Sequence, residues 1–235
     1  KWEIANSKEA AYPTVLDKWI LARAKEFVAG VGEGLDKYDT VRATRIIEDY
    51  IEDLSTWYLR RSRGRKDNAF FATLHEALMK TAQVIAPVMP YVSEFLYLNL
   101  IGNSAEAEYP ESVHLNDWPE TEELSEEEKN ILRDMKVVRD AASIGQAARK
   151  SLKIPVRQPL PRLGFSLKKR DLPQPELMQI LLDELNVKKF DSEILREKNS
   201  DVFVVSETAS VENFYLDTSI SEELRSEGLV RALER

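Results

Sequence analysis

The chain has 235 residues, enough for one large domain or two modest ones, and it contains no cysteine. The lack of cysteine excludes disulfides, thiolate zinc sites, iron–sulfur clusters and cysteine nucleophiles, and it is compatible with a reducing compartment. Hydrophobic residues make up 43% and charged residues 31%, which is typical of a globular protein and too apolar for a disordered one. No segment approaches the ~20 apolar residues of a membrane helix. Because the net charge is −8, any local cluster of cations needs an explanation.

Helical periodicity runs through the first hundred residues, where apolar side chains recur at three- and four-residue steps. Asp39 is placed to cap the second predicted helix, Pro87 to follow the third, and Gly102 to end the fourth. The four predicted helices cover approximately residues 16–35, 40–58, 70–86 and 91–101.

From residue 103 the pattern changes from helical to acidic. Residues 103–128 carry many carboxylates and no Lys or Arg, which predicts an acidic loop whose residues 113–118 pack back onto the helices. Ser125 and Glu128 have the spacing of a capping box, so we expect them to open a fifth helix.

Beyond Lys153, prolines break the helical pattern and short elements alternate. Strands are predicted at residues 163–167, 187–190, 202–205 and 211–216, and helices at 175–185 and from 221 onward. The predicted fold class is therefore mainly α, with a helical bundle over residues 1–153 and a small α+β module over residues 154–235. Since the chain begins without a methionine and stops within a predicted helix, we expect a fragment of a longer protein.

Catalytic and metal-binding chemistry finds little support in the sequence. There is no Gly-rich phosphate loop, no nucleophile elbow and no pair of histidines at zinc-binding spacing. We expect His75 to be a half-buried helix residue and His114 to make a local hydrogen bond, so that neither forms a metal site. Carboxylates on the second helix resemble a ligand cluster, but their spacing favours a solvated face: Glu48, Asp49, Glu52 and Asp53.

Residues 55–66, with the sequence STWYLRRSRGRK, hold a dense group of cations. The candidate residues for binding an anionic partner are Arg60, Arg61, Arg63, Arg65 and Lys66. Arginine pairs bidentately with phosphate and stacks on bases, although the same side chains would also stabilise a helix C-terminus and pair with the acidic loop. Trp57 and Tyr58 precede the cations and can stack on a base, but their place on an apolar face favours core packing for Trp57.

A second basic cluster lies where the two predicted units join, and it favours polyanion binding over simple salt bridging. Its candidate residues for binding a polyanion are Arg149, Lys150, Lys153 and Arg157. Two such clusters on an acidic chain mean that positive charge is segregated, and the local field rather than the net charge governs polyanion binding. Because zinc fingers, RNP-type strands and a GXXG loop are absent, we expect a module that reads the shape of structured RNA.

Several motifs, in their order along the chain, resemble the anticodon-binding helical domain of class I aminoacyl-tRNA synthetases, and of the isoleucyl enzymes in particular. Two of them are DLSTWYLRRSR at residues 53–63 and IAPVMPY at residues 85–91. The others occupy residues 12–24, 38–43, 46–49, 112–119, 157–160, 184–188 and 224–231. The resemblance covers nearly the whole chain.

The resemblance implies a cytoplasmic tRNA-binding module without an active site, because the HIGH and KMSKS motifs and the editing domain of the family are absent. The implied partners are tRNA, specifically tRNA-Ile, and the catalytic and editing domains of the same polypeptide, with no DNA and no membrane. ATP and Mg²⁺ would act in the catalytic domain of the full-length enzyme, and zinc elsewhere in it, so no cofactor is expected here. The alternative is a helical protein-interaction module that binds no RNA.

Overall fold

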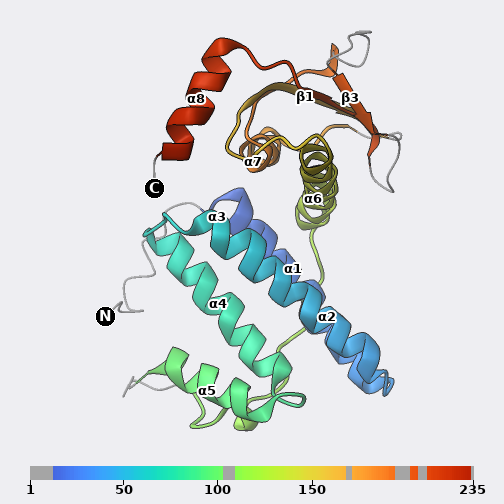
Figure 1. Cartoon of the computed structure of the whole chain (residues 1–235). Coiled ribbons are helices and arrows are strands. Elements are labelled where there is room, and N and C mark those ends of the chain that lie inside the picture. The colour runs from blue at the N-terminus through green and yellow to red at the C-terminus, as the bar shows by residue number, and fades with distance from the viewer. Residues whose placement is uncertain (1–12, 103–108, 168–170, 194–201, 206–210, 234–235) are drawn as a thin grey trace. The chain divides into compact units, whose positions relative to one another are not determined.

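The computed structural model describes residues 13–102, 109–167, 171–193, 202–205 and 211–233 (Figure 1). The described chain is mainly helical, with a small sheet in its C-terminal part, which confirms the predicted fold class. It forms two compact units, Lys1–Leu132 and Arg133–Arg235. This division falls inside helix α6 (Glu126–Ser151), whereas the sequence places a domain boundary between residues 153 and 154, just past the end of that helix. The domain boundary stays a prediction.

The first unit is a bundle of helices that follows the predicted pattern. Its helices are α1 (Val15–Asp36), α2 (Thr40–Glu52), η2 (Asp53–Leu59), α3 (Arg60–Ser62), α4 (Asn68–Ile85), α5 (Pro90–Ile101), the 3-10 helix η3 (Val113–Leu115) and the start of α6. Helix α1 packs against α2 and α4, and α4 packs against α5 (Figure 1). The four helices predicted from periodicity are confirmed, except that the second continues through a π-helical segment, η2.

Side chains cap these helices where they begin. Thr14 and Asp17 form a capping box at the start of α1. Ser125 and Glu128 form the predicted capping box at the start of α6, with backbone-to-side-chain distances of 2.8 and 3.2 Å. Asp67 caps α4. A capping carboxylate is favoured there because it pairs with unsatisfied N–H groups and with the positive end of the helix dipole.

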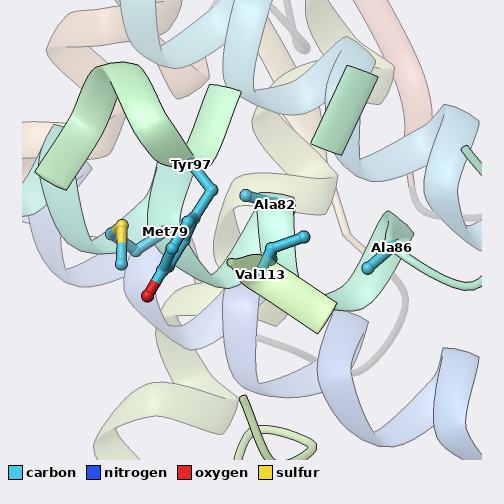
Figure 2. Packing of buried hydrophobic residues seen from close by; sticks show 5 residues of the cluster. All are labelled: Met79, Ala82, Ala86, Tyr97 and Val113. Atoms are coloured by element: carbon cyan, nitrogen blue, oxygen red, sulfur yellow. The ribbon is translucent and has the colours of Figure 1, made fainter. Parts of the chain in front are cut away.

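Large apolar side chains fill the interior of the bundle. Phe27 of α1 and Tyr50 of α2 stack with their ring centroids 4.3 Å apart. Figure 2 shows a second cluster, formed by Met79, Ala82, Ala86, Tyr97 and Val113. This cluster joins α4, α5 and η3, which are separated in the sequence by up to about thirty residues.

The segment after α5 packs back onto the bundle, as predicted. Val113 is buried, and the hydroxyl of Tyr97 donates a hydrogen bond of 2.9 Å to the carbonyl oxygen of Pro110. The indole Nε1 of Trp118 lies 3.3 Å from the position that a Cβ on Gly32 would occupy, so the absence of a side chain there makes room for the ring.

The second unit builds a four-stranded sheet from β1 (Leu160–Ser166), β2 (Val187–Phe190), β3 (Val202–Val205) and β4 (Glu212–Asp217). The strand order is β2-β1-β4-β3, with β2 parallel to β1 and the other neighbouring pairs antiparallel. Helix α7 (Pro175–Leu185) connects the two parallel strands, and α8 (Glu222–Leu233) follows the sheet. Leu160, Phe165, Leu181, Phe214 and Leu216 lie in the core of this unit.

Three of the family-like motifs, at residues 157–160, 184–188 and 224–231, meet in the second unit. Gln158 donates a hydrogen bond of 2.7 Å to the carbonyl oxygen of Leu224, and a Cβ on Gly228 would lie only 2.5 Å from Gln158 Oε1. Arg231 donates a hydrogen bond of 2.6 Å to the side chain of Asn186, which has a left-handed backbone. The motifs therefore hold α8 against the ends of β1 and α7.

Candidate nucleic-acid interface

The helix that carries the first basic cluster changes from α to π before it reaches the arginines. Among its buried residues, Tyr50, Leu54, Tyr58 and Ser62 are spaced four positions apart. On a regular α-helix each such step turns the stripe by about 40°, so the last residue would point about 120° away from the first. The wider π-helical turn of η2 lets these residues stay on one buried side, and it thereby sets which neighbours are exposed.

Trp57 and Tyr58 are buried to different degrees. Tyr58 is fully buried, whereas Trp57 is only half-buried, so the prediction that Trp57 is a core residue is wrong. The guanidinium of Arg60 lies over the Trp57 ring, 6.0 Å from its centroid. At this distance the cation and the ring attract each other weakly.

Asp53 is a second correction. Glu48, Asp49 and Glu52 are exposed, as expected for a solvated face, but Asp53 is buried. Its Oδ2 accepts a hydrogen bond of 2.8 Å from Nε of Arg23 on α1, so this carboxylate joins two helices of the bundle. Burial would lower the pKa of Arg23, but the carboxylates of Asp53 and Glu26 together outweigh that effect and the pKa is raised.

The first basic cluster lies at the end of the helix and in the turn that follows it. Arg60, Arg63 and Lys66 are exposed, and Arg61 is half-buried. Helix α3 ends at Ser62, so the cations after it lie in a turn rather than on a continuing helix. Arg60 and Arg61 therefore lie in the last turn of the helix, and Arg63 and Lys66 lie in the turn that follows.

Arg65 differs from the other members of this cluster because its guanidinium is bound within the protein. Nη1 and Nη2 lie 2.7 and 2.8 Å from the two carboxylate oxygens of Asp17. Nε and Nη2 lie 3.0 and 2.8 Å from the oxygens of Asp67, and Nη1 also donates to Thr14 at 3.1 Å. The hydroxyl of Tyr58 donates to Asp17 at 2.7 Å. We call Asp17, Tyr58, Arg65 and Asp67 the Asp17 clamp.

The Asp17 clamp makes the stability of the bundle sensitive to acid. Burial would raise the pKa of Asp17, but its hydrogen bonds, the strongest from Arg65, outweigh this effect and hold the pKa below the usual value. The hydrogen bond from Arg65 is also the main reason why the pKa of Asp67 falls from 3.8 to about 2. Because both carboxylates bind protons more weakly in the folded chain, their stabilisation is present above about pH 4 and is lost as the pH falls toward 2.

We therefore expect urea midpoints to be level from pH 7 to pH 5 and to drop below pH 4. Arg65→Gln should show a smaller drop than the parent chain between pH 5 and pH 3, because its carboxylates lose the partner that lowers their pKa. Equal drops in the two proteins would mean that the clamp carboxylates do not titrate as this geometry requires.

The second basic cluster contains exposed cations and one buried arginine. Lys150, Lys153 and Arg157 are exposed at and after the end of α6. Arg149, in contrast, is 1% exposed. Its Nη1 donates to the carbonyl oxygens of Pro155 and Gln158, both at 3.0 Å, and its Nη2 donates to those of Leu185 and Asn186 at 2.6 and 3.2 Å.

The structure thus gives Arg149 a structural role in place of the RNA contact expected from the sequence. A Cβ on Gly145, one turn earlier, would lie 2.5 Å from Leu185 Cδ1, so the small residue lets α6 approach α7 closely enough for Arg149 to reach its end. Two of the four acceptors belong to the C-terminal end of α7, where the helix dipole is negative and favours a cation. Burial lowers the pKa of Arg149 to about 10, so the guanidinium remains charged at neutral pH.

Carboxylates of the acidic segment supply partners to α1. Lys25 pairs with Glu122 and Glu128 at 2.8 and 3.0 Å, and Lys18 pairs with Glu127 at 2.9 Å. Among the residues that the structure describes, no group of three or more His, Asp or Glu side chains is placed to hold a metal ion. None of the described helices is long and apolar enough to cross a membrane.

Residues 17–163 match the family described as the anticodon-binding domain of tRNA ligase, and the chain belongs to this family. Its relatives include isoleucine–tRNA ligases. The ligase of Dehalococcoides mccartyi is 36% identical over 93% of this chain, that of Streptomyces coelicolor 36% identical over 74%, and that of Thermus thermophilus 35% identical over 78%. The aligned parts make up 22%, 17% and 17% of those ligases, so the chain spans about a fifth of their length. The resemblance seen in the sequence motifs is confirmed.

Proposed function

We propose that this chain is the tRNA-binding module of an isoleucine–tRNA ligase and that it binds the anticodon arm of tRNA-Ile. The observation that carries the proposal is the exposure of Arg60 and Arg63 at the end of a helix, in a chain that belongs to the anticodon-binding family. Arginine at such a place reaches phosphate oxygens with two N–H groups at once.

The contacts proposed in the first unit are Arg60, Arg61, Arg63 and Lys66, and those in the second unit are Lys150, Lys153 and Arg157. Arg149 is left out because its guanidinium is buried, and Arg65 because its donors are occupied. Phosphate contacts of this kind position a nucleic acid and carry no sequence information themselves.

The mechanism of the module is positional. Its cations neutralise phosphates of the anticodon arm and hold that arm in one register, so that the acceptor end of the tRNA is presented to a catalytic domain elsewhere in the polypeptide. Because the chain spans about a fifth of its relatives, aminoacylation with ATP and Mg²⁺, editing, any zinc site and the cytoplasmic location are proposed for the full-length enzyme.

A triple variant tests the first cluster. Arg60→Ala, Arg61→Ala and Arg63→Ala together should weaken binding of tRNA-Ile by about 10- to 100-fold, or roughly 0.5–1 kcal/mol per contact. The slope of log K against log salt should become shallower by about 2–3, because each lost phosphate contact releases one fewer counterion. Filter binding between about 50 and 200 mM salt measures both quantities.

A matched control removes the same charge from residues just before and within the first half of α2. Lys37→Ala, Arg42→Ala and Arg45→Ala change exposed cations near the start of α2. Arg45, the nearest of them in the sequence, precedes Arg60 by 15 residues, or roughly 22 Å along the helix. This control should retain the affinity of the parent. Equal affinity and slope in both triple variants, or equally tight binding of an unrelated acidic protein, would end the proposal.

A further inference from the structure

Arg65 lies in the same turn as Arg63 and Lys66, but its guanidinium is bound by side chains of the protein itself. A guanidinium has five N–H donors, and in Arg65 each of them meets an oxygen of Thr14, Asp17 or Asp67. The side chain is 21% exposed, and Phe70 lies beside it with its ring centroid 5.6 Å from the guanidinium carbon. A phosphate could bind Arg65 only if it displaced a carboxylate that is already held in bidentate geometry.

The partners of Arg65 come from segments far apart in the sequence. Asp17 belongs to the first turn of α1, and Asp67 caps α4. Tyr58, which also donates to Asp17, lies in η2 just before the first basic cluster. Tyr58, which precedes Arg60, and Arg65, which follows Arg63, therefore both bind the carboxylate of Asp17.

This arrangement limits the freedom of the turn between α3 and α4. The backbone N–H of Arg65 donates to the carbonyl oxygen of Ser62 at 2.9 Å, and Asp67 accepts from the N–H of Phe70 at 2.9 Å. The only glycine in the turn, Gly64, has no neighbour within 4 Å of a built Cβ, so packing does not hold it. These two local hydrogen bonds lie at the two ends of the turn, whereas the side chain of Arg65 joins the turn itself to α1.

We propose that Arg65 is a positioning residue for tRNA binding, which holds the turn of residues 63–66 against α1 so that Arg63 and Lys66 meet the phosphates in a fixed arrangement. This inference rests on the proposed function. Ordering the turn before binding removes part of the entropy cost that tRNA would otherwise meet. The carboxylates Asp17 and Asp67 then favour binding of a polyanion although they carry the same charge as the RNA.

Removing either carboxylate is therefore a test, because the two explanations predict opposite changes in tRNA affinity. If charge alone mattered, Asp67→Asn and Asp17→Asn would tighten tRNA binding, because each removes a negative charge beside the basic cluster. If Arg65 positions the turn, both variants should weaken tRNA-Ile binding by about 3- to 10-fold. Asparagine caps a helix about as well as aspartate, so Asp67→Asn leaves the start of α4 intact and its folding can be verified by circular dichroism. Glu52→Gln is the matched control, since it removes one exposed carboxylate from α2, the helix that leads into the first basic cluster, and should leave affinity equal or slightly raised.

Conservative and combined variants complete the experiment. Arg65→Lys keeps the charge but loses the fork, so it should weaken binding nearly as much as Arg65→Gln, with a salt slope close to that of the parent. When Arg60, Arg61 and Arg63 are already alanine, Arg65→Gln should add less than its effect in the parent. Two results would overturn the inference. One is full tRNA affinity in Arg65→Lys together with a salt slope that is shallower by about 0.7–0.9 in Arg65→Gln, as expected for a direct phosphate contact. The other is tighter tRNA binding in the two Asp→Asn variants. Failure of the proposed function gives a different result, because the variant with Arg60, Arg61 and Arg63 all replaced by alanine would then bind tRNA-Ile as tightly as the parent.

Discussion

Replacing Arg149 with alanine is expected to lower the free energy of unfolding by about 3–5 kcal/mol, whereas replacing its neighbour Lys150 should change it by less than about 0.5 kcal/mol. Arg149 donates to four carbonyl oxygens at the junction of α6, β1 and α7, and two of them, Pro155 and Asn186, also accept from a backbone N–H. Its removal takes a charged donor from all four oxygens and leaves a cavity beside Leu185. Lys150 is exposed and contributes little to packing.

Urea titration of the two single variants measures this difference, and Arg149→Lys sharpens it. Lysine keeps the charge but cannot reach four oxygens in a planar fork, so Arg149→Lys should remain substantially destabilised. If Arg149→Ala unfolds like the parent and instead loses tRNA affinity with a shallower salt slope, Arg149 belongs to the RNA contact surface after all.

Tyr58→Ala is expected to cost about 3–5 kcal/mol of stability, while Trp57→Ala should cost only about 1–2 kcal/mol. Tyr58 is fully buried, lies beside Phe70 with ring centroids 5.9 Å apart, and donates its hydroxyl to Asp17. Trp57 is half-buried beside Arg60, so less of its surface leaves water on folding. The larger side chain should therefore be the less costly one to remove.

Denaturant titration of both variants, with Tyr58→Phe as a third, separates the contributions of the ring and the hydroxyl. Tyr58→Phe should cost about 1–2 kcal/mol, since it removes one hydrogen bond to a buried carboxylate and keeps the ring. A cost for Trp57→Ala as large as that for Tyr58→Ala would contradict the rotation that the π-helical segment imposes on this helix.

Several elements could be predicted from the sequence because their determinants lie within a few residues. Helix α7 has the predicted bounds, Pro175–Leu185, and so do strands β2 and β3. Asp39 caps α2 through the N–H of Arg42, and the Ser125–Glu128 box opens α6. Both capping interactions join residues three positions apart, and neither cap depends on the rest of the fold.

The buried face was less predictable for a helix that is apolar on most of its sides. Helix α5 is apolar almost all round, and its sequence offers no reason to bury Tyr97 while Tyr91 and Phe95 stay exposed. The choice follows from contact with α4 and η3, which the periodicity of α5 does not encode (Figure 2). The strand order β2-β1-β4-β3 was likewise outside what the pattern of single strands predicts.

The sequence by itself determined the family, the succession of helices and strands, and the two places where cations gather. Only the tertiary structure decided which of those cations face solvent. Arg149 and Lys150 are neighbours, but one is buried by carbonyl groups up to 37 residues away and the other is exposed. Arg65 meets its carboxylate partner 48 residues away. Helix caps and periodicity act over a few residues and can be read along the chain, whereas the burial of a charge depends on partners that come close only when the chain folds.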